Sequence, residues 1–267
     1  MSYLFLSPAK INLDLKILGR REDGYHLIRS EMVAINLFDE LEIDLSSENL
    51  LHSAEPIPFD FTTSIFAKVY NQVKRKIPNL PCFQIKIKKS IPIGAGLGGG
   101  SSNAATFIFA IRHLLNCDWT DKEMIEIAKG VGADVPFFFS YGRALVEGIG
   151  TEITLFPPQR RKFFTLLFDA ASIATPEVYR HVDPNQLDPN AKNQLEKFAE
   201  IAYPTYAQTL KGWKNLFGGV TMTGSGSSAF IEGIHPFEHY GLEGFHCHTI
   251  DRSPNEWYKR SFDTNTI

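Results

Sequence analysis

The chain has 267 residues, a formal net charge of −3 and 43% hydrophobic residues, so it can bury one large core or two modest ones. The slightly acidic balance, without runs of lysine and arginine, argues against a nucleic acid as a standing partner. No apolar run reaches the roughly 18 residues that a membrane span needs, and the three widely spaced cysteines favour a reducing compartment. We therefore expect a cytoplasmic protein of two domains that has no membrane partner.

The first predicted element is a strand over residues 9–17, in which apolar and polar side chains alternate. Lys10 and Asn12 share its polar face and therefore point the same way. A single lysine in such a strand ordinarily belongs to a solvated face. Lys10 needs a specific partner elsewhere in the chain before a functional role can be assigned to it.

A turn-rich segment, GRREDGYH at residues 19–26, follows this strand and predicts a hairpin that returns over residues 32–37. The segment places Tyr25 and His26 at the hairpin tip. An aromatic ring beside an imidazole can stack on a planar base and hydrogen-bond its edge, although such a pair more often packs a loop.

Residues 41–45 predict another strand, and residues 60–76 predict a helix that two prolines end. Residues 83–89 alternate apolar and basic side chains, which is typical of an antiparallel strand with one wet face. This strand leads into the stretch IPIGAGLGGGSSNAA at residues 91–105, after which apolar side chains recur at helical spacing up to Leu115.

The glycines of this stretch predict an anion-binding loop. Without Cβ atoms they can adopt positive φ and turn successive N–H groups toward an anion. Two serines stand where the following helix would start, with its partial positive charge. The expected guest is a polyphosphate. The residues that carry this prediction are Gly96, Gly98, Gly99, Gly100, Ser101 and Ser102.

The glycine stretch fits three further kinds of loop less well. A flexible turn rarely needs five glycines followed by two hydroxyls and an amphipathic helix. A Walker A loop is excluded, because Ser101 stands where its lysine would be. A dinucleotide-binding loop matches at Gly94, Gly96 and Gly99, but such a loop follows an apolar parallel strand, whereas residues 83–89 alternate. A nucleotide phosphate remains the expected ligand, and NAD is the less favoured alternative.

Thr120 and Glu123 predict a capping box for a helix that ends at Gly130. Residues 142–155 predict a closing hairpin, and the proline pair at residues 157–158 indicates a domain boundary.

Asp134 is the one acid in the apolar segment VGADVPFFF at residues 131–139. A buried carboxylate needs a partner, because an isolated buried charge is costly. Asp134 can cap a helix or a turn, or it can pair with a cation, for which Lys10 is the candidate. Such a pair would keep the carboxylate ionised near neutral pH, so that it could accept a proton from a hydroxyl.

The second part of the chain mixes strands and helices. The predicted elements are a strand at residues 163–168, a loop at 169–179 that carries Thr175 and Tyr179, helices at 191–202 and 206–217, and a strand, turn and strand at 219–231. Further on, His246 and His248 share one side of a strand, which makes a metal site conceivable. We expect none, because no second chelating pair is spaced to complete it.

Together these segments resemble the GHMP kinases, which phosphorylate small hydroxyl substrates with ATP. PAKINLDL at residues 8–15, PIGAGLGGGSSNAA at residues 92–105 and MTGSGSSAF at residues 222–230 are similar to the three motifs of the family and stand in the same order. GRREDGYH at residues 19–26 and GADVPFF at residues 132–138 are similar to those members that act on a cytidine-diphosphate-linked polyol in the non-mevalonate isoprenoid route.

The resemblance implies an α+β fold of two domains, residues 1–156 and 157–267, with the active site in the cleft between them. It implies that Asp134 accepts the substrate hydroxyl proton and that Lys10 stabilises charge near the transferred phosphoryl group. It places Lys89 near the adenine. The residues that it implies wrap the ATP phosphates are Pro92, Gly94, Gly96, Leu97, Gly98, Gly99, Gly100, Ser101 and Ser102. The residues implied to bind the alcohol substrate are Asn12, Tyr25, His26, Thr175 and Tyr179, with Tyr25, His26 and Tyr179 around the cytosine, and residues 223–227 are implied to support its phosphates.

The implied co-substrate is ATP with Mg²⁺, and the implied partner is the small cytidine-diphosphate-linked polyol, bound by a monomer or a weak homodimer. Three alternatives remain. Another GHMP kinase, acting on homoserine, mevalonate or a sugar, would share the glycine loop. An NAD-dependent dehydrogenase would need a parallel apolar strand before Gly94. A non-catalytic protein on the same scaffold would bind ATP without turnover.

Overall fold

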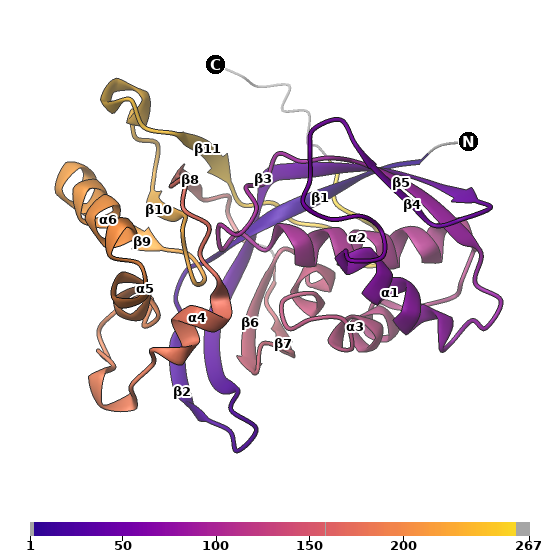
Figure 1. Cartoon of the computed structure of the whole chain (residues 1–267), viewed down its shortest axis with the longest axis horizontal. Coiled ribbons are helices and arrows are strands. Elements are labelled where there is room, and N and C mark those ends of the chain that lie inside the picture. The colour runs from indigo at the N-terminus through magenta and orange to yellow at the C-terminus, as the bar shows by residue number, and fades with distance from the viewer. Residues whose placement is uncertain (1–2, 158, 260–267) are drawn as a thin grey trace.

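The structure, a computed structural model, describes residues 3–157 and 159–259. Its strands form two sheets, one of seven strands and one of four, and helices pack against both sheets (Figure 1). The α+β class that the sequence implies is confirmed.

The first sheet has its strands in the first part of the chain. It is formed by β1 (Tyr3–Asn12), β2 (Lys16–Arg20), β3 (His26–Ser46), β4 (Leu50–Ser53), β5 (Cys82–Lys88), β6 (Arg143–Gly148) and β7 (Glu152–Leu155). The second sheet is formed by β8 (Phe163–Leu167), β9 (Thr221–Met222), β10 (Ala229–Glu232) and β11 (Gly244–His248). The helices are α1 (Ile65–Lys74), α2 (Gly99–Leu114), α3 (Asp121–Lys129), α4 (Thr175–Arg180), α5 (Glu196–Ala202) and α6 (Pro204–Phe217), with short 3-10 turns η1 (Pro136–Phe139), η2 (Pro184–Gln186) and η3 (Phe237–Tyr240).

β3 organises the first sheet, because it pairs antiparallel with β1, β2, β5 and β6 along different parts of its 21 residues. Residues 32–37 and 41–45, predicted as two strands, are parts of this single strand. The residues between them keep the pairing, since Asp39 lies opposite Ser7 of β1. The predicted antiparallel strand at residues 83–89 is confirmed as β5.

The prediction of one continuous strand over residues 9–17 is wrong. β1 ends at Asn12 and β2 begins at Lys16, and the chain bends at Leu13 between them. The Asp14 carboxylate accepts the Glu31 backbone N–H at 2.6 Å, which fixes the bend against β3. Apolar side chains stay buried on both sides of the break, so the alternating pattern gives no sign of it.

Helices α1, α2 and α3 cover one face of the first sheet (Figure 1). The prediction that the first helix begins at Asp60 is wrong, because the Asp60 carboxylate closes a turn by accepting the Thr63 N–H at 2.9 Å. Ser64 then caps α1 by accepting the Phe66 N–H. The capping box predicted for α3 is confirmed.

The second sheet is antiparallel throughout, in the order β11-β8-β10-β9, and α4, α5 and α6 pack with it around a second core. The strand at residues 163–168 and the strand, turn and strand at 219–231 are confirmed. Part of the predicted loop at 169–179 is instead the short helix α4, which has Pro176 in its first turn. The predicted helix at 191–202 begins only at Glu196, as α5.

A third core joins the two sheets. It is built from Ala9, Ile11, Val33, Ile35, Leu37, Ile91, Ala95, Leu97, Phe164, Leu166, Phe230 and Cys247. After β11 the chain returns to the first sheet, and Ile250, Trp257 and Tyr258 pack in its core. The domain boundary predicted at residues 157–158 falls between the last strand of the first sheet and the first strand of the second. Pro158 itself lies outside the described residues.

Candidate active site

A cavity of about 470 Å³ opens beside the glycine loop and the N-terminus of α2. Residues from β1, the segment before α1, α4 and the turn after β9 complete its wall. The residues predicted to wrap a polyphosphate that do line it are Pro92, Gly94, Gly96, Leu97, Gly98, Gly99, Gly100 and Ser101. A cavity walled by a glycine-rich backbone at a helix N-terminus is suited to an anion.

Two glycines allow the loop to approach its neighbours closely. Gly98, the N-cap of α2, has φ +70°, and a Cβ there would lie 2.9 Å from Lys10 Cγ. Gly96 has φ +74°, and a Cβ there would collide with the Thr223 carbonyl and lie 2.8 Å from that of Gly226. The loop therefore packs directly on the first and last motifs of the sequence.

The prediction that Ser101 and Ser102 stand at the helix cap is wrong. α2 begins two residues earlier, with Gly98 as an N-cap that makes no side-chain hydrogen bond. Ser101 lines the cavity, but Ser102 is fully buried and its hydroxyl accepts a hydrogen bond from Ser7 at 2.9 Å. The Ser102 side chain is therefore turned away from the polyphosphate that it was predicted to bind.

Lys10 and Asp134 meet at the cavity, as predicted. The Lys10 ammonium lies 3.7 Å from the Asp134 carboxylate. It also donates to the Asn12 side-chain oxygen at 2.6 Å and to the Gly96 carbonyl at 2.8 Å. Lys10 is almost completely buried, whereas the Asp134 side chain keeps a third of its surface exposed. The carboxylate is thus open to a ligand while the ammonium is fixed on the glycine loop.

Burial lowers the pKa of Lys10 from its ordinary value of 10.5, because desolvation disfavours the ammonium form. The charge of Asp134 and its hydrogen bond to Lys10 oppose this effect. The neighbouring carboxylate therefore helps to keep Lys10 protonated in a site that would otherwise favour the neutral amine.

Hydrogen bonds fix the orientation of the Asn12 amide. The Ser30 hydroxyl donates to the Asp14 carbonyl at 2.5 Å, so it accepts from the Asn12 side-chain N–H at 2.7 Å. The amide oxygen then faces Lys10, which can only donate. Ser30, which no motif of the sequence singles out, is thus a support of the predicted pair.

The turn after β9 also reaches the cavity. Thr175 of α4 and Ser225 both line it, and their hydroxyls share a hydrogen bond of 2.7 Å. The Asn193 side chain donates to the Met222 and Gly224 carbonyls at 2.8 and 2.7 Å, which holds this turn in place. Asn193 was not predicted, since its two acceptors lie far along the chain.

The aromatic residues come together only in part. His26 of the β2–β3 hairpin stacks on Tyr179 of α4, with ring centroids 5.2 Å apart and planes inclined by 29°. Tyr179 lines the cavity, and burial, helped by the nearby Asp134, raises the pKa of its hydroxyl. Tyr25 is 62% exposed and does not line the cavity. The structure therefore brings His26 to Tyr179 but leaves Tyr25 outside the cavity.

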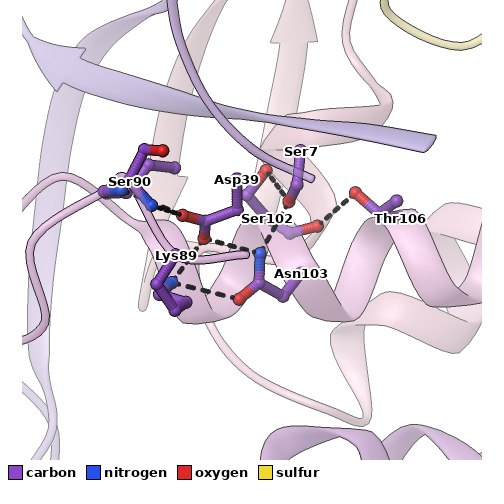
Figure 2. A network of polar contacts seen from close by, with 8 residues as sticks. Ser7, Asp39, Lys89, Ser90, Ser102, Asn103 and Thr106 are labelled. Carbon is purple, nitrogen blue, oxygen red and sulfur yellow. Dashed lines mark hydrogen bonds and ion pairs between the residues drawn. The ribbon is translucent and has the colours of Figure 1, made fainter. Parts of the chain in front are cut away.

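Lys89 lines the cavity, but its ammonium pairs with the buried carboxylate of Asp39 (Figure 2). It also donates to the side-chain oxygen of Asn103 at 3.3 Å. Neither Asp39 nor Asn103 was predicted. One feature of the sequence could have indicated that Asp39 is buried. Asp39 lies two residues before the buried Leu41 on the same strand, so the two side chains share one face.

Among residues 3–157 and 159–259, no three histidine, cysteine, aspartate or glutamate side chains are grouped as metal ligands. His246 instead bonds through its ring to the His235 carbonyl at 2.8 Å. Within the same ranges, no helix has both the length and the apolar character needed to cross a bilayer.

Comparison with known proteins places this site in a family. The family described as GHMP kinases N terminal domain matches residues 64–142. The 4-diphosphocytidyl-2-C-methyl-D-erythritol kinase of Protochlamydia amoebophila is 34% identical over 96% of this chain and 93% of its own length. A crystal structure of 4-(cytidine 5'-diphospho)-2C-methyl-D-erythritol kinase has a TM-score of 0.76 and 27% identity, over 94% of this chain and 100% of that one.

The alternatives are not favoured. A homoserine kinase from Cytophaga hutchinsonii has a TM-score of 0.69 over 94% of this chain and 95% of its own, but at 15% identity it shares the fold alone. The strand before the glycine loop is antiparallel to β3, which is not the setting of a dinucleotide-binding loop. The chain therefore belongs to the GHMP kinase family and, within it, groups with the 4-diphosphocytidyl-2-C-methyl-D-erythritol kinases.

Proposed function

We propose that this kinase transfers the terminal phosphoryl group of ATP to the 2-hydroxyl of 4-diphosphocytidyl-2-C-methyl-D-erythritol, a step of non-mevalonate isoprenoid precursor synthesis. The observation that carries the proposal is the contact of Lys10 with Asp134 at a cavity walled by glycine backbone. The names of its relatives supply the substrate.

The ATP phosphates lie along the glycine loop in this proposal. The N-terminus of α2 and the backbone N–H groups between Gly96 and Gly100 lie at the cavity wall, and together they favour a polyphosphate. Lys89 and the cavity wall at Ser64 and Phe66 then lie toward the adenine side. Ser102 is not placed against the phosphates in this proposal, because its side chain is fully buried and does not line the cavity.

Asp134 takes the proton as the reaction proceeds. The substrate hydroxyl oxygen forms a bond to the γ-phosphorus, and the bond from that phosphorus to the β–γ bridging oxygen breaks. The hydroxyl proton passes to the Asp134 carboxylate, and ADP leaves. Lys10 stabilises the charge on the transferred group, and its bonds to Asn12 and the Gly96 carbonyl hold it ready before the substrate binds.

The cytosine stacks on Tyr179 in this proposal. The His26 ring now covers that face of Tyr179, and its centroid, 5.2 Å away, leaves no room for a base between the two rings. His26 therefore moves aside and hydrogen-bonds the edge of the base. Thr175 and Ser225 are placed to bind the diphosphate or the polyol next to it.

We propose that the site would also hold Mg²⁺ together with the nucleotide. The described residues offer no cluster of three ligands, but Asp134 and Ser101 supply hard oxygen donors to the cavity wall, which is the ligand chemistry that Mg²⁺ accepts. Phosphate oxygens and water would provide most of its coordination. The ion would neutralise charge on the phosphates.

Several wider assignments accompany the proposal. The two sheets support the proposed division into domains of residues 1–156 and 157–267, except that the described segment after β11 packs in the core of the first domain. A monomer or a weak homodimer remains the working unit of the proposal. The three cysteines form no disulfide, which supports the cytoplasm as the location.

ADP release measured with a panel of alcohols tests the proposal. We expect the highest kcat/KM with the cytidine-diphosphate-linked methylerythritol. The free polyol should react roughly ten- to a hundredfold less efficiently, the value of one stacked base. The Tyr179→Leu variant should lose most of this preference. A higher kcat/KM with homoserine or mevalonate would overturn the substrate assignment.

A further inference from the structure

Asp39 is fully buried on β3 and accepts hydrogen bonds from four donors. Its Oδ1 accepts the backbone N–H groups of Ser90 at 2.8 Å and Ile91 at 2.9 Å. Its Oδ2 accepts from the Lys89 ammonium and, at 2.9 Å, from the Asn103 side chain (Figure 2). Each oxygen thus serves a different pair of donors.

The four donors lie at the two ends of the glycine loop. Ser90 and Ile91 stand at the start of the loop, shortly after β5. Asn103 lies in the second turn of α2, just beyond the end of the loop. The two ends also touch each other, because a Cβ on Gly99 would lie 2.9 Å from Ile91 Cγ2 and 3.4 Å from Lys89 Nζ. One carboxylate therefore joins both ends of the loop that faces the cavity.

Asp39 itself does not line the cavity, whereas Lys89 and Asn103 do. Any effect of Asp39 on a bound nucleotide must pass through these two residues and through the loop backbone. Asn103 is held from a second side, since it also donates to the Ser7 hydroxyl at 2.8 Å. The chain's own groups thus complete the network, which is the arrangement of a preorganised site.

We propose that Asp39 is a positioning residue for the nucleotide. It fixes both ends of the glycine loop and holds the Lys89 ammonium against the cavity wall, so that its loss weakens nucleotide binding and spares the alcohol side of the site. This inference rests on the proposed function only in so far as the nucleotide phosphates occupy the glycine loop.

The Asp39→Asn variant tests the proposal, because it keeps the shape of the side chain and removes its charge. The amide oxygen can serve one pair of donors, and its NH₂ group then faces the other pair without an acceptor for them. We expect the KM for ATP and the Kd for ADP to rise about tenfold or more. The KM for the alcohol and kcat should change by less than about threefold.

Glu40→Gln is the matched control. Glu40 is the next residue of the same strand, and its carboxylate lies 3.9 Å from Lys88 on the exposed side. Removing this charge should leave the KM for ATP and the Kd for ADP unchanged. Equal losses in Glu40→Gln and Asp39→Asn would show a general effect of charge and would overturn the proposal.

A double-mutant cycle with Lys89→Met separates positioning from simple structural damage. If Asp39 acts partly through the Lys89 ammonium, the loss of ADP affinity in the double variant is smaller than the product of the two single losses. A rise in both KM values by the same factor, or fully independent effects in the cycle, would contradict the inference.

A second variant keeps the test decisive if Asp39→Asn yields no folded protein. Asn103→Ala removes one donor from Asp39 and leaves its charge paired with Lys89. It should weaken ADP binding with no change in the KM for the alcohol, and unchanged ADP binding would overturn the proposal. If the parent protein binds ADP but does not phosphorylate the alcohol, the proposed substrate fails while these binding measurements still test Asp39.

Discussion

At the scale of single residues, the site depends on a buried lysine that lies beside a carboxylate. Lys10 donates to Asn12, to the Gly96 carbonyl and toward Asp134, so that each proton of its ammonium has an acceptor nearby. Ser30 fixes the amide of Asn12 in the orientation that this arrangement needs. The lysine thus links the glycine loop to the carboxylate that we propose takes the proton.

The lowered pKa of Lys10 predicts the alkaline limit of activity. The charged form is the active one, so kcat should fall as the pH rises through a pKa below the ordinary 10.5. The same lowered pKa has the opposite effect on the stability of the fold, which should rise with pH. Between the folded and unfolded pKa values the unfolded chain binds the extra proton, so the contribution of Lys10 to the free energy of unfolding rises with pH. A pH profile of kcat that stays flat up to 10.5 would contradict the assignment.

At the scale of elements, the glycine loop works because it packs on the turn after β9. Gly96 lies against the carbonyls of Thr223 and Gly226, and the amide of Ser228 donates to the Ala95 carbonyl at 3.2 Å. Asn193 holds the turn from the other side. Two turns far apart in the sequence thus form one wall of the cavity.

Gly96→Ala should lower the free energy of unfolding by about 1–3 kcal/mol, because its Cβ would meet backbone oxygens at positive φ. Gly100→Ala is the control for stability. A Cβ on Gly100 would meet nothing within 4 Å, so its free energy of unfolding should stay within about 0.5 kcal/mol. Urea denaturation of the two variants measures this difference, and equal stabilities would show that the close approach has no weight.

At the scale of the whole molecule, the segment after β11 holds the catalytic half together. Arg252 is buried and donates to the carbonyls of Phe139, Ser140 and Glu256, and it pairs with Asp121 at 3.1 Å. It thus fixes η1, which begins two residues after Asp134. The described segment after β11 therefore supports the position of Asp134, the proposed proton acceptor.

Arg252→Met should lower the free energy of unfolding by about 3–5 kcal/mol, since it leaves Asp121 and several carbonyls without their donor. Lys259→Met, in the same segment, removes an exposed cation that pairs with Glu256 at 3.1 Å. This control should lose no more than about 1 kcal/mol. Thermal or urea unfolding compares the two, and a small loss for Arg252→Met would show that the segment is only loosely attached.

Patterns of neighbouring residues correctly predicted those elements that depend on local interactions. The alternation of β5, the capping box of α3 and the glycine loop before α2 all follow from neighbouring residues, and the structure confirms them. The start of α1 was missed because the Asp60 turn competes with the helix. Asp39 and Asn193 were missed because their partners come from distant segments, and the meeting of Lys10 with Asp134 was expected chiefly from the family resemblance.

The rate of phosphoryl transfer in a single turnover of Asp134→Asn tests the central claim most directly. The amide keeps the shape of the side chain but cannot take the hydroxyl proton. The account predicts a fall of roughly two orders of magnitude or more in that rate, with the Kd for ATP nearly unchanged. A single-turnover rate equal to that of the parent protein would contradict the assignment of Asp134 as the proton acceptor.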